Sequence, residues 1–256
     1  MAMSSKFIRI FGLLASLLLA LTSLTSPNSA LAKEAVDVEL VLLSDASNSI
    51  DNAEIKFQRQ GYATAITHPN VLAAIRKGGL GKIAVTFIEW ADADNQDTVV
   101  PWMVIKDKQS AEAFAKALFA RDRKAYGSNA IGAALTHAHA QIDTNKYEGH
   151  RKVIDLSGDS ANNWHGIPIS VARDKAVKAG IIINGLAILC RSENCGGRPV
   201  DYNLEQAFAQ QIIGGPRSFV VTVDSPARFA QAVRSKLILE LAALPSAVST
   251  DNLFRR

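Results

Sequence analysis

Short apolar segments alternate with helix-like segments along almost the whole chain after residue 33, and no other feature constrains the fold as strongly. Continuous runs rich in Val, Ile and Leu, such as 36–43 and 181–189, are typical of strands buried on both faces. Segments with helical spacing, such as 51–67 and 168–179, separate them. This order predicts an α/β fold with three layers, a doubly wound and mostly parallel sheet with helices on both faces.

The expected elements cover most of the chain. We predict strands at 36–43, 82–90, 98–105, 151–156, 181–189 and 218–223, and helices at 51–67, 69–75, 110–120, 130–142, 168–179, 204–213 and 226–241. Pro101 has no backbone N–H to give to a central ladder. The strand at 98–105 is therefore expected to be the one antiparallel strand, at the edge of the sheet.

The first 32 residues have the layout of a secretory signal peptide. Lys6 and Arg9 precede an apolar run at 10–24, and Ala30-Leu31-Ala32 offers a small-residue cleavage site. The alternative, a membrane anchor, needs an apolar run of about 20 residues. We therefore predict cleavage after Ala32, a periplasmic or secreted protein without stable membrane insertion, one domain at 33–244 and a flexible tail at 245–256.

Charge and cysteine content narrow the choice of partners and redox chemistry. The chain has 28 basic and 24 acidic residues, and removal of Lys6 and Arg9 with the signal peptide leaves a net charge of about +2. This weak balance favours no nucleic-acid partner. Cys190 and Cys195 lie close together in a Gly-rich loop, which favours a local disulfide in an exported protein over a metal site.

Oxygen-bearing side chains follow the first predicted strand in the pattern D-x-S-x-S. In extended backbone, residues two apart point the same way, so Asp45, Ser47 and Ser49 can converge. A carboxylate with two hydroxyls suits a hard cation, most of all Mg²⁺, with Mn²⁺ or Ca²⁺ as alternatives. The same residues could instead cap the following helix. Two later loops carry further oxygens, at Ser128-Asn129 and Ser157-Gly158-Asp159.

The stretch LVLLSDASNSI resembles the first strand and metal-ion-dependent adhesion site of von Willebrand factor A (vWA) domains. The stretches FIEWA, VIDLSGDSANN, AGIIINGLAI and IIGGPRSFV are similar to a family of exported bacterial vWA-like proteins with no assigned function. The resemblance implies that Asp159 supplies the third-loop Asp of the metal site. It places Asn129 where the family has Thr, a departure that alters the site.

These features together predict a binding module rather than an enzyme. A metal held by Asp45, Ser47, Ser49, Asn129 and Asp159 would bind an acidic residue of a protein partner. Asn163, Trp164 and His165 follow the Asp159 loop and are candidates for the rim of the partner site, or for an ordinary turn. Two alternatives stay open: a hydrolase in which Asp159 or His165 activates a metal-bound water, and a metal-free scaffold. The sequence leaves the oligomeric state open.

Overall fold

The structure is a computed structural model that describes residues 32–189 and 200–242. The described residues from Lys33 onward belong to one compact unit. The disulfide predicted between Cys190 and Cys195, the tail predicted at 245–256 and nearly all of the predicted signal peptide lie outside the described residues.

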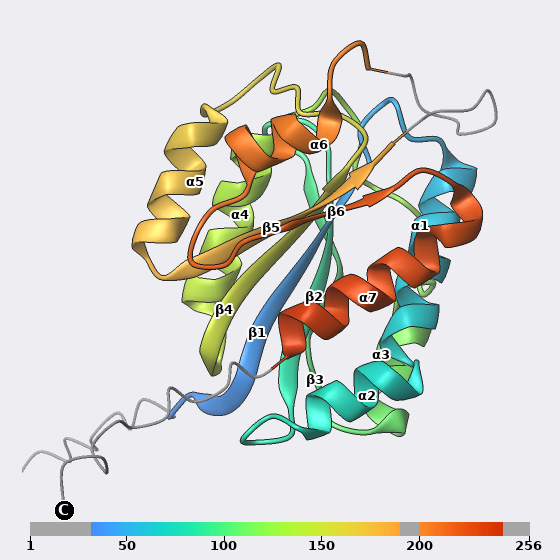
Figure 1. The fold of residues 1–256 in the computed structure, drawn as a ribbon, viewed down its shortest axis with the longest axis vertical. Helices are drawn as coiled ribbons and strands as arrows, with labels where there is room; N and C mark the ends of the chain where they lie inside the picture. The colour runs from blue at the N-terminus through green and yellow to red at the C-terminus, as the bar shows by residue number, and fades with distance from the viewer. Residues whose placement is uncertain (1–31, 190–199, 243–256) are drawn as a thin grey trace, which may run out of the picture. The chain divides into compact units, whose positions relative to one another are not determined.

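A six-stranded sheet forms the centre of the described domain (Figure 1). Its strands are β1 (Glu34–Asp45), β2 (Ile83–Trp90), β3 (Gln96–Ile105), β4 (Tyr147–Gly158), β5 (Ile181–Ile188) and β6 (Val220–Val223). The order across the sheet is β3-β2-β1-β4-β5-β6, and every neighbouring pair is parallel except β2 and β3. The predicted fold class is confirmed, including the antiparallel strand at the edge.

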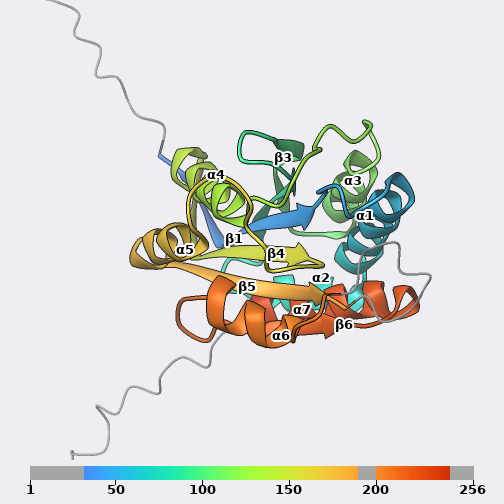
Figure 2. The ribbon, with the colours of Figure 1, turned by 90° about the horizontal axis from the view of Figure 1, so that it is seen from above.

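Helices cover both faces of this sheet (Figure 2). They are α1 (Asn52–Ile66), α2 (Pro69–Arg76), α3 (Lys108–Ala117), α4 (Ile131–Thr144), α5 (Ile169–Lys178), α6 (Leu204–Ala207) with the π-helix η1 (Phe208–Ile212), and the 3-10 helix η2 (Pro226–Arg228) with α7 (Phe229–Leu241). Apolar side chains of α1, α2, α3 and α7 share one core cluster, and those of α4, α5, α6 and η1 share another.

The alternation of side chains along β1 explains why both faces need a helical layer. Leu40 and Leu42 join the core under α1 and α7, whereas Val41 and Leu43 join the core under α4 and α5. Successive side chains of a strand point to opposite faces. All four are fully buried, so the continuous apolar run of the sequence reflects burial on both sides of the strand.

The edge strand β3 tolerates Pro101 because the pairing with β2 is interrupted there. The register shifts between Val85 and Phe87, and the side chain of Pro101 is exposed. The hydroxyl of Thr86 donates to the carbonyl oxygen of Val100 at 2.8 Å within this irregularity. The structure thus confirms the position that the missing proline N–H predicts.

The parallel strands bring their carboxyl ends to one edge of the sheet, where ligands bind in folds of this kind. β1 ends at Asp45 and β4 ends at Gly158, directly before Asp159. The two loops that the sequence singled out therefore start side by side. Within the described residues, no helix combines the length and hydropathy needed to cross a membrane.

Candidate functional site

The loop after β1 folds its oxygen atoms toward the loop after β4. One carboxylate oxygen of Asp45, Oδ1, accepts a hydrogen bond from the backbone N–H of Ser47 at 2.8 Å. The hydroxyls of Ser47 and Ser49 lie 3.1 Å apart, and the hydroxyl of Ser49 donates to Oδ1 of Asp159 at 3.2 Å. The structure brings these four predicted site residues into one connected cluster.

The first helix does not use this cluster as its cap. Asp51 accepts hydrogen bonds from the backbone N–H groups of Ala53 and Glu54, and the Glu54 side chain accepts one from the backbone N–H of Asp51. This reciprocal capping box satisfies the start of α1. Asp51 therefore fills the capping role that could have explained Asp45 and the two serines.

Two acidic oxygens of the cluster are left without a partner. Oδ2 of Asp45 and Oδ2 of Asp159 are buried and have no hydrogen-bond partner among the described residues. Burial, together with the negative charge of Asp159, raises the pKa of Asp45 to about 8. Burial also raises the pKa of Asp159. Desolvated carboxylates that lie close together are costly unless a cation or a proton neutralises them.

Glycine at 158 allows the two loops to approach. A Cβ atom at Gly158 would lie 3.1 Å from Oδ2 of Asp45, closer than ordinary van der Waals contact. A larger residue would therefore push the β4 loop away from the Asp45 carboxylate. The Ser-Gly-Asp order before Ser160 thus has a steric reason.

Asn129 is connected to the cluster through the loop after β4. Its side chain is almost fully buried, and its amide nitrogen donates to the hydroxyl of Ser160 at 2.7 Å. Its backbone carbonyl accepts a hydrogen bond from the N–H of Trp164 at 2.8 Å. The amide oxygen of Asn129 is the atom that remains for a cation, since the nitrogen is bonded to Ser160.

Arg123 holds the D-x-S-x-S loop in place, and no sequence pattern pointed to it. Its guanidinium donates to the backbone carbonyl oxygens of Ala46, Ser47 (3.1 Å) and Ile50 (2.7 Å). The guanidinium also lies 4.3 Å from the centre of the Tyr126 ring. An arginine that binds carbonyls from a distant loop is recognised only from tertiary structure, because its local sequence carries no periodic signal.

The predicted rim residues have different roles in the structure. The side chain of Asn163 accepts from the N–H of Gly132 at 2.9 Å and donates to the carbonyl of Ile167 at 3.2 Å. Both of its polar ends thus stabilise the fold of the loop. Trp164 is 66% exposed, and His165 is also exposed. Of the three residues predicted to form a rim, these two have side chains accessible to solvent.

The chemistry of the cluster fits a hard divalent cation. Asp45, Asp159, Ser47 and Ser49 offer only oxygen atoms, and the two orphaned carboxylate oxygens lack a positive partner. Among the described residues, no group of three or more His, Cys, Asp or Glu side chains is placed to hold a metal ion. The candidate site therefore depends on hydroxyls in addition to two carboxylates.

The family model described as "Protein of unknown function (DUF1194)" matches residues 35–245. No curated protein sequence matches the chain. The matches to solved structures show the fold alone, because their sequence identities are low.

Three solved structures illustrate this likeness. The von Willebrand factor type A protein from Catenulispora acidiphila has 18% identity and a TM-score of 0.54, over 81% of this chain and 43% of that protein. Proximal thread matrix protein 1 from the mussel byssus "with zinc occupied MIDAS motif" has 16% identity and a TM-score of 0.56, over 82% of this chain and 48% of that protein. The pilus adhesin SpaC from Lactobacillus rhamnosus GG has 16% identity and a TM-score of 0.51, over 82% of this chain and 30% of that protein. The chain thus spans less than half the length of each.

Proposed function

Because this chain belongs to the DUF1194 family and has a vWA-like fold, we propose that it is an exported binding module that uses a divalent metal to hold a protein partner. The observation that carries the proposal is the pair of orphaned, buried carboxylate oxygens on Asp45 and Asp159. Mg²⁺ is the proposed ion, with Mn²⁺ and Ca²⁺ as alternatives, because all the available ligands are oxygen atoms.

Each residue of the cluster has a part in this proposal. Asp45 and Asp159 supply the negative charge, while Ser47 and Ser49 supply hydroxyl oxygens. Asn129 contributes through its amide oxygen or by positioning Ser160. A cation bound there would keep an open coordination position to which a carboxylate of the partner can attach. Arg123 keeps the loop in the shape that the cation needs, through its hydrogen bonds to three backbone carbonyls.

Two of the similar solved structures support a binding role over catalysis. One is a matrix protein with a zinc-occupied MIDAS motif, and the other is a pilus adhesin. A hydrolase would need a base that activates a metal-bound water. Among the described residues, the exposed His165 makes no hydrogen bond with Asp159 that would orient it for this role. Export to the periplasm or the medium, after cleavage behind Ala32, is part of the same proposal.

Calorimetric titration of the Lys33–Arg256 unit with Mg²⁺ and with Mn²⁺ tests the metal site. We expect binding to the native sequence, and loss of binding in Asp45→Asn and Asp159→Asn. The matched control is Asp174→Asn, which alters an exposed aspartate on α5 whose partner is Arg173. Absence of binding in the native protein, or binding unchanged in Asp45→Asn, would falsify the proposal and favour the metal-free scaffold.

A further inference from the structure

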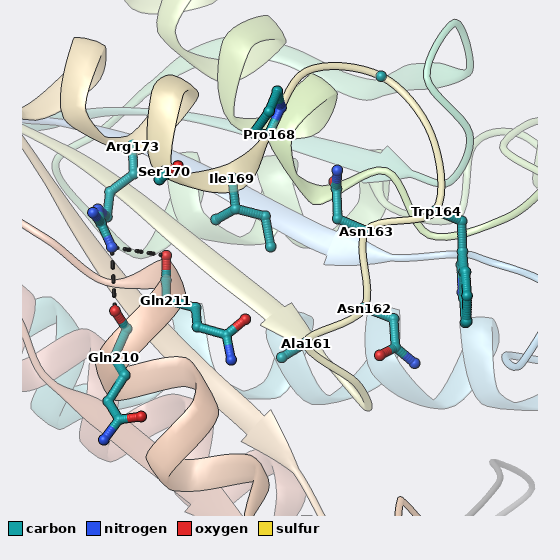
Figure 3. Close-up of a pocket in the computed structure, with 11 residues that line it drawn as sticks. Ala161, Asn162, Asn163, Trp164, Pro168, Ile169, Ser170, Arg173, Gln210 and Gln211 are labelled. Atoms are coloured by element: carbon teal, nitrogen blue, oxygen red, sulfur yellow. Dashed lines mark hydrogen bonds between the residues drawn. The ribbon is translucent and has the colours of Figure 1, made fainter.

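An open groove follows the loop after β4 (Figure 3). Its volume is about 850 Å³, and its walls are the loop after β4, the start of α5 and the π-helix η1. The lining begins at Ala161, only two residues after Asp159. A partner that reaches the metal with one side chain therefore has this groove next to its neighbouring residues.

Arg173 joins the two helical walls of the groove. Its guanidinium donates to the backbone carbonyl oxygens of Gln210 at 3.2 Å and Gln211 at 3.0 Å, as the dashed lines in Figure 3 show. Another of its nitrogen atoms donates to Asp174 at 2.8 Å. The arginine is thus used to hold α5 against η1. The π-helix η1 is a second indication that the groove is a functional site, because such turns are rare and are found often at functional sites.

The groove offers hydrogen-bonding groups that the fold does not use. The side-chain amides of Asn162, Gln210 and Gln211 line it and form no hydrogen bond with any other described residue. Each amide presents both donors and an acceptor, which matches the alternating N–H and C=O groups of an extended peptide. Trp164 lies at one end in Figure 3, and its indole is 66% exposed. Exposed aromatic rings of this kind anchor partners in protein interfaces.

Charge favours this side of the metal site for an acidic partner. The eleven residues that line the groove include one arginine and no carboxylate. Asp159 itself lines a second, smaller hollow of about 280 Å³, together with Glu205 and Tyr202. Glu54 lies toward the start of α1, and burial, the charge of Asp51 and the charge of Asp159 raise its pKa. An acidic partner is repelled on those two sides and not along the groove.

We propose that this groove binds an extended peptide segment of an acidic protein partner, directly beside the carboxylate that the partner gives to the metal. The amides of Asn162, Gln210 and Gln211 bind the main chain of the segment, and Trp164 packs against one of its apolar or aromatic side chains. The inference rests on the proposed function and adds the chemistry of the partner to it.

Selection from a displayed peptide library tests the groove. The library has one fixed Asp with several randomised positions on each side, and it is selected on the Lys33–Arg256 unit in the presence of Mg²⁺. We expect apolar or aromatic residues to be enriched on one side of the Asp only. Trp164→Ala and the double variant Gln210→Ala/Gln211→Ala should weaken the selected peptides about tenfold, the effect of losing one interface anchor.

Two control variants alter similar side chains away from the groove. Phe119→Ala removes an exposed aromatic residue, and Gln206→Ala removes an exposed amide on α6. Both should bind the selected peptides as the native protein does. Tryptophan emission gives an independent signal, since Trp90 is fully buried and Trp164 is exposed. A peptide seated in the groove should shift the emission, and Trp164→Phe should abolish that shift.

The outcomes separate this inference from the proposed function. Peptides that bind equally to the native protein and to Asp45→Asn, yet need Trp164, would support the groove and contradict the metal-dependent function. Normal Mg²⁺ binding without side preference in the peptides, or with full affinity in Trp164→Ala, would overturn the groove inference alone. Failure to select any peptide, or binding of soluble oligosaccharides in place of peptides, would also overturn it.

Discussion

Among the described residues, two pairs of buried carboxylates differ in whether the chain supplies a counter-charge. Asp155 and Glu240 lie inside the fold with Lys236, whose ammonium nitrogen is 2.6 Å from Asp155 and 2.5 Å from Glu240. Asp45 and Asp159 lie at the carboxyl edge of the sheet, with hydroxyls as neighbours and no cationic side chain of the described residues bonded to them. The first pair carries its own cation, and the second leaves that position open.

Both pairs contain buried oxygens without a hydrogen-bond partner, so the counter-charge is what distinguishes them. Asn184 donates to Glu240 at 3.0 Å, and Lys236 lies 5.4 Å from the centre of the Phe219 ring. Neighbours from β5 and α7 thus surround the inner cluster, although Oδ2 of Asp155 and Oε2 of Glu240 accept no hydrogen bond among the described residues. Each carboxylate at the sheet edge likewise keeps one orphaned oxygen, but no ammonium group of the described residues pairs with it. The contrast indicates that a buried acid pair is structural where the chain supplies the counter-charge, and a candidate binding site where it does not.

The largest expected effect comes from removing the internal cation. Lys236→Met should lower the free energy of unfolding by about 3–5 kcal/mol, because it leaves two buried carboxylates without a positive partner. Urea denaturation monitored by circular dichroism measures this loss. Lys56→Met, which alters an exposed lysine on α1, is the control and should change stability by less than about 0.5 kcal/mol. A loss below about 1 kcal/mol in Lys236→Met would show that Lys236 is not what balances the acid pair.

Removing a charge from Asp45 and Asp159, the pair at the sheet edge, should instead increase the free energy of unfolding. In metal-free protein above pH 8, where the Asp45 carboxylate is charged, Asp45→Asn should raise the free energy of unfolding by about 1–4 kcal/mol, because it removes one of two buried charges that lack a counter-ion. Mg²⁺ at a hundred times its dissociation constant should then stabilise the native protein by about 2.7 kcal/mol and leave the variant unchanged. Denaturation with chelator and with Mg²⁺ measures both. Asp174→Asn should behave as the native protein in both conditions, and a destabilised Asp45→Asn would break the comparison.

The dependence of stability on pH should separate the two pairs. Burial raises the pKa of Glu240 to about 7 and, with Asp159, that of Asp45 to about 8. Between pH 5 and these values the folded protein holds protons that the unfolded chain has already lost, so stability falls as pH rises. The slope should be at most about 1.4 kcal/mol per pH unit for each group.

Two variants show how much each carboxylate pair contributes to this slope of stability against pH. Glu240→Gln should remove one part of it, and Asp45→Asn the other. Saturating Mg²⁺ should remove only the Asp45 part, since the cation then takes the place of the proton. Unfolding curves measured from pH 5 to pH 8 test this. Stability that rises over that range, or a slope that Mg²⁺ leaves unchanged, would contradict the assignment.

The architecture and the D-x-S-x-S loop of the site could be predicted from the sequence, because the signals for both lie in residues that are neighbours along the chain. These signals are the continuous apolar runs of the strands, the missing N–H of Pro101 and the two-residue spacing of Asp45, Ser47 and Ser49. Lys236 and Glu240 have the spacing of an ordinary ion pair on an exposed helix face, so their burial against Asp155 was not predictable. The role of Arg123 also depends on contacts across more than seventy residues.

Asn129 was predicted from the sequence as a metal ligand, whereas its hydrogen bond to Ser160 is seen only in the structure. Its truncation should give the smallest effect. Asn129→Ala removes the hydrogen bond to Ser160, which is worth about 0.5–1.5 kcal/mol of stability. We also expect Mg²⁺ affinity to fall about threefold to tenfold, because the amide oxygen is lost as a ligand.

Ser160→Ala removes the same hydrogen bond and keeps the amide oxygen. Calorimetry on both variants and on the double variant therefore separates the two roles. If Asn129 acts only through Ser160, all three variants will bind Mg²⁺ with equal affinity. If its oxygen contacts the ion, Asn129→Ala will bind more weakly than Ser160→Ala, and an amide will serve at this position where the vWA resemblance leads one to expect a hydroxyl.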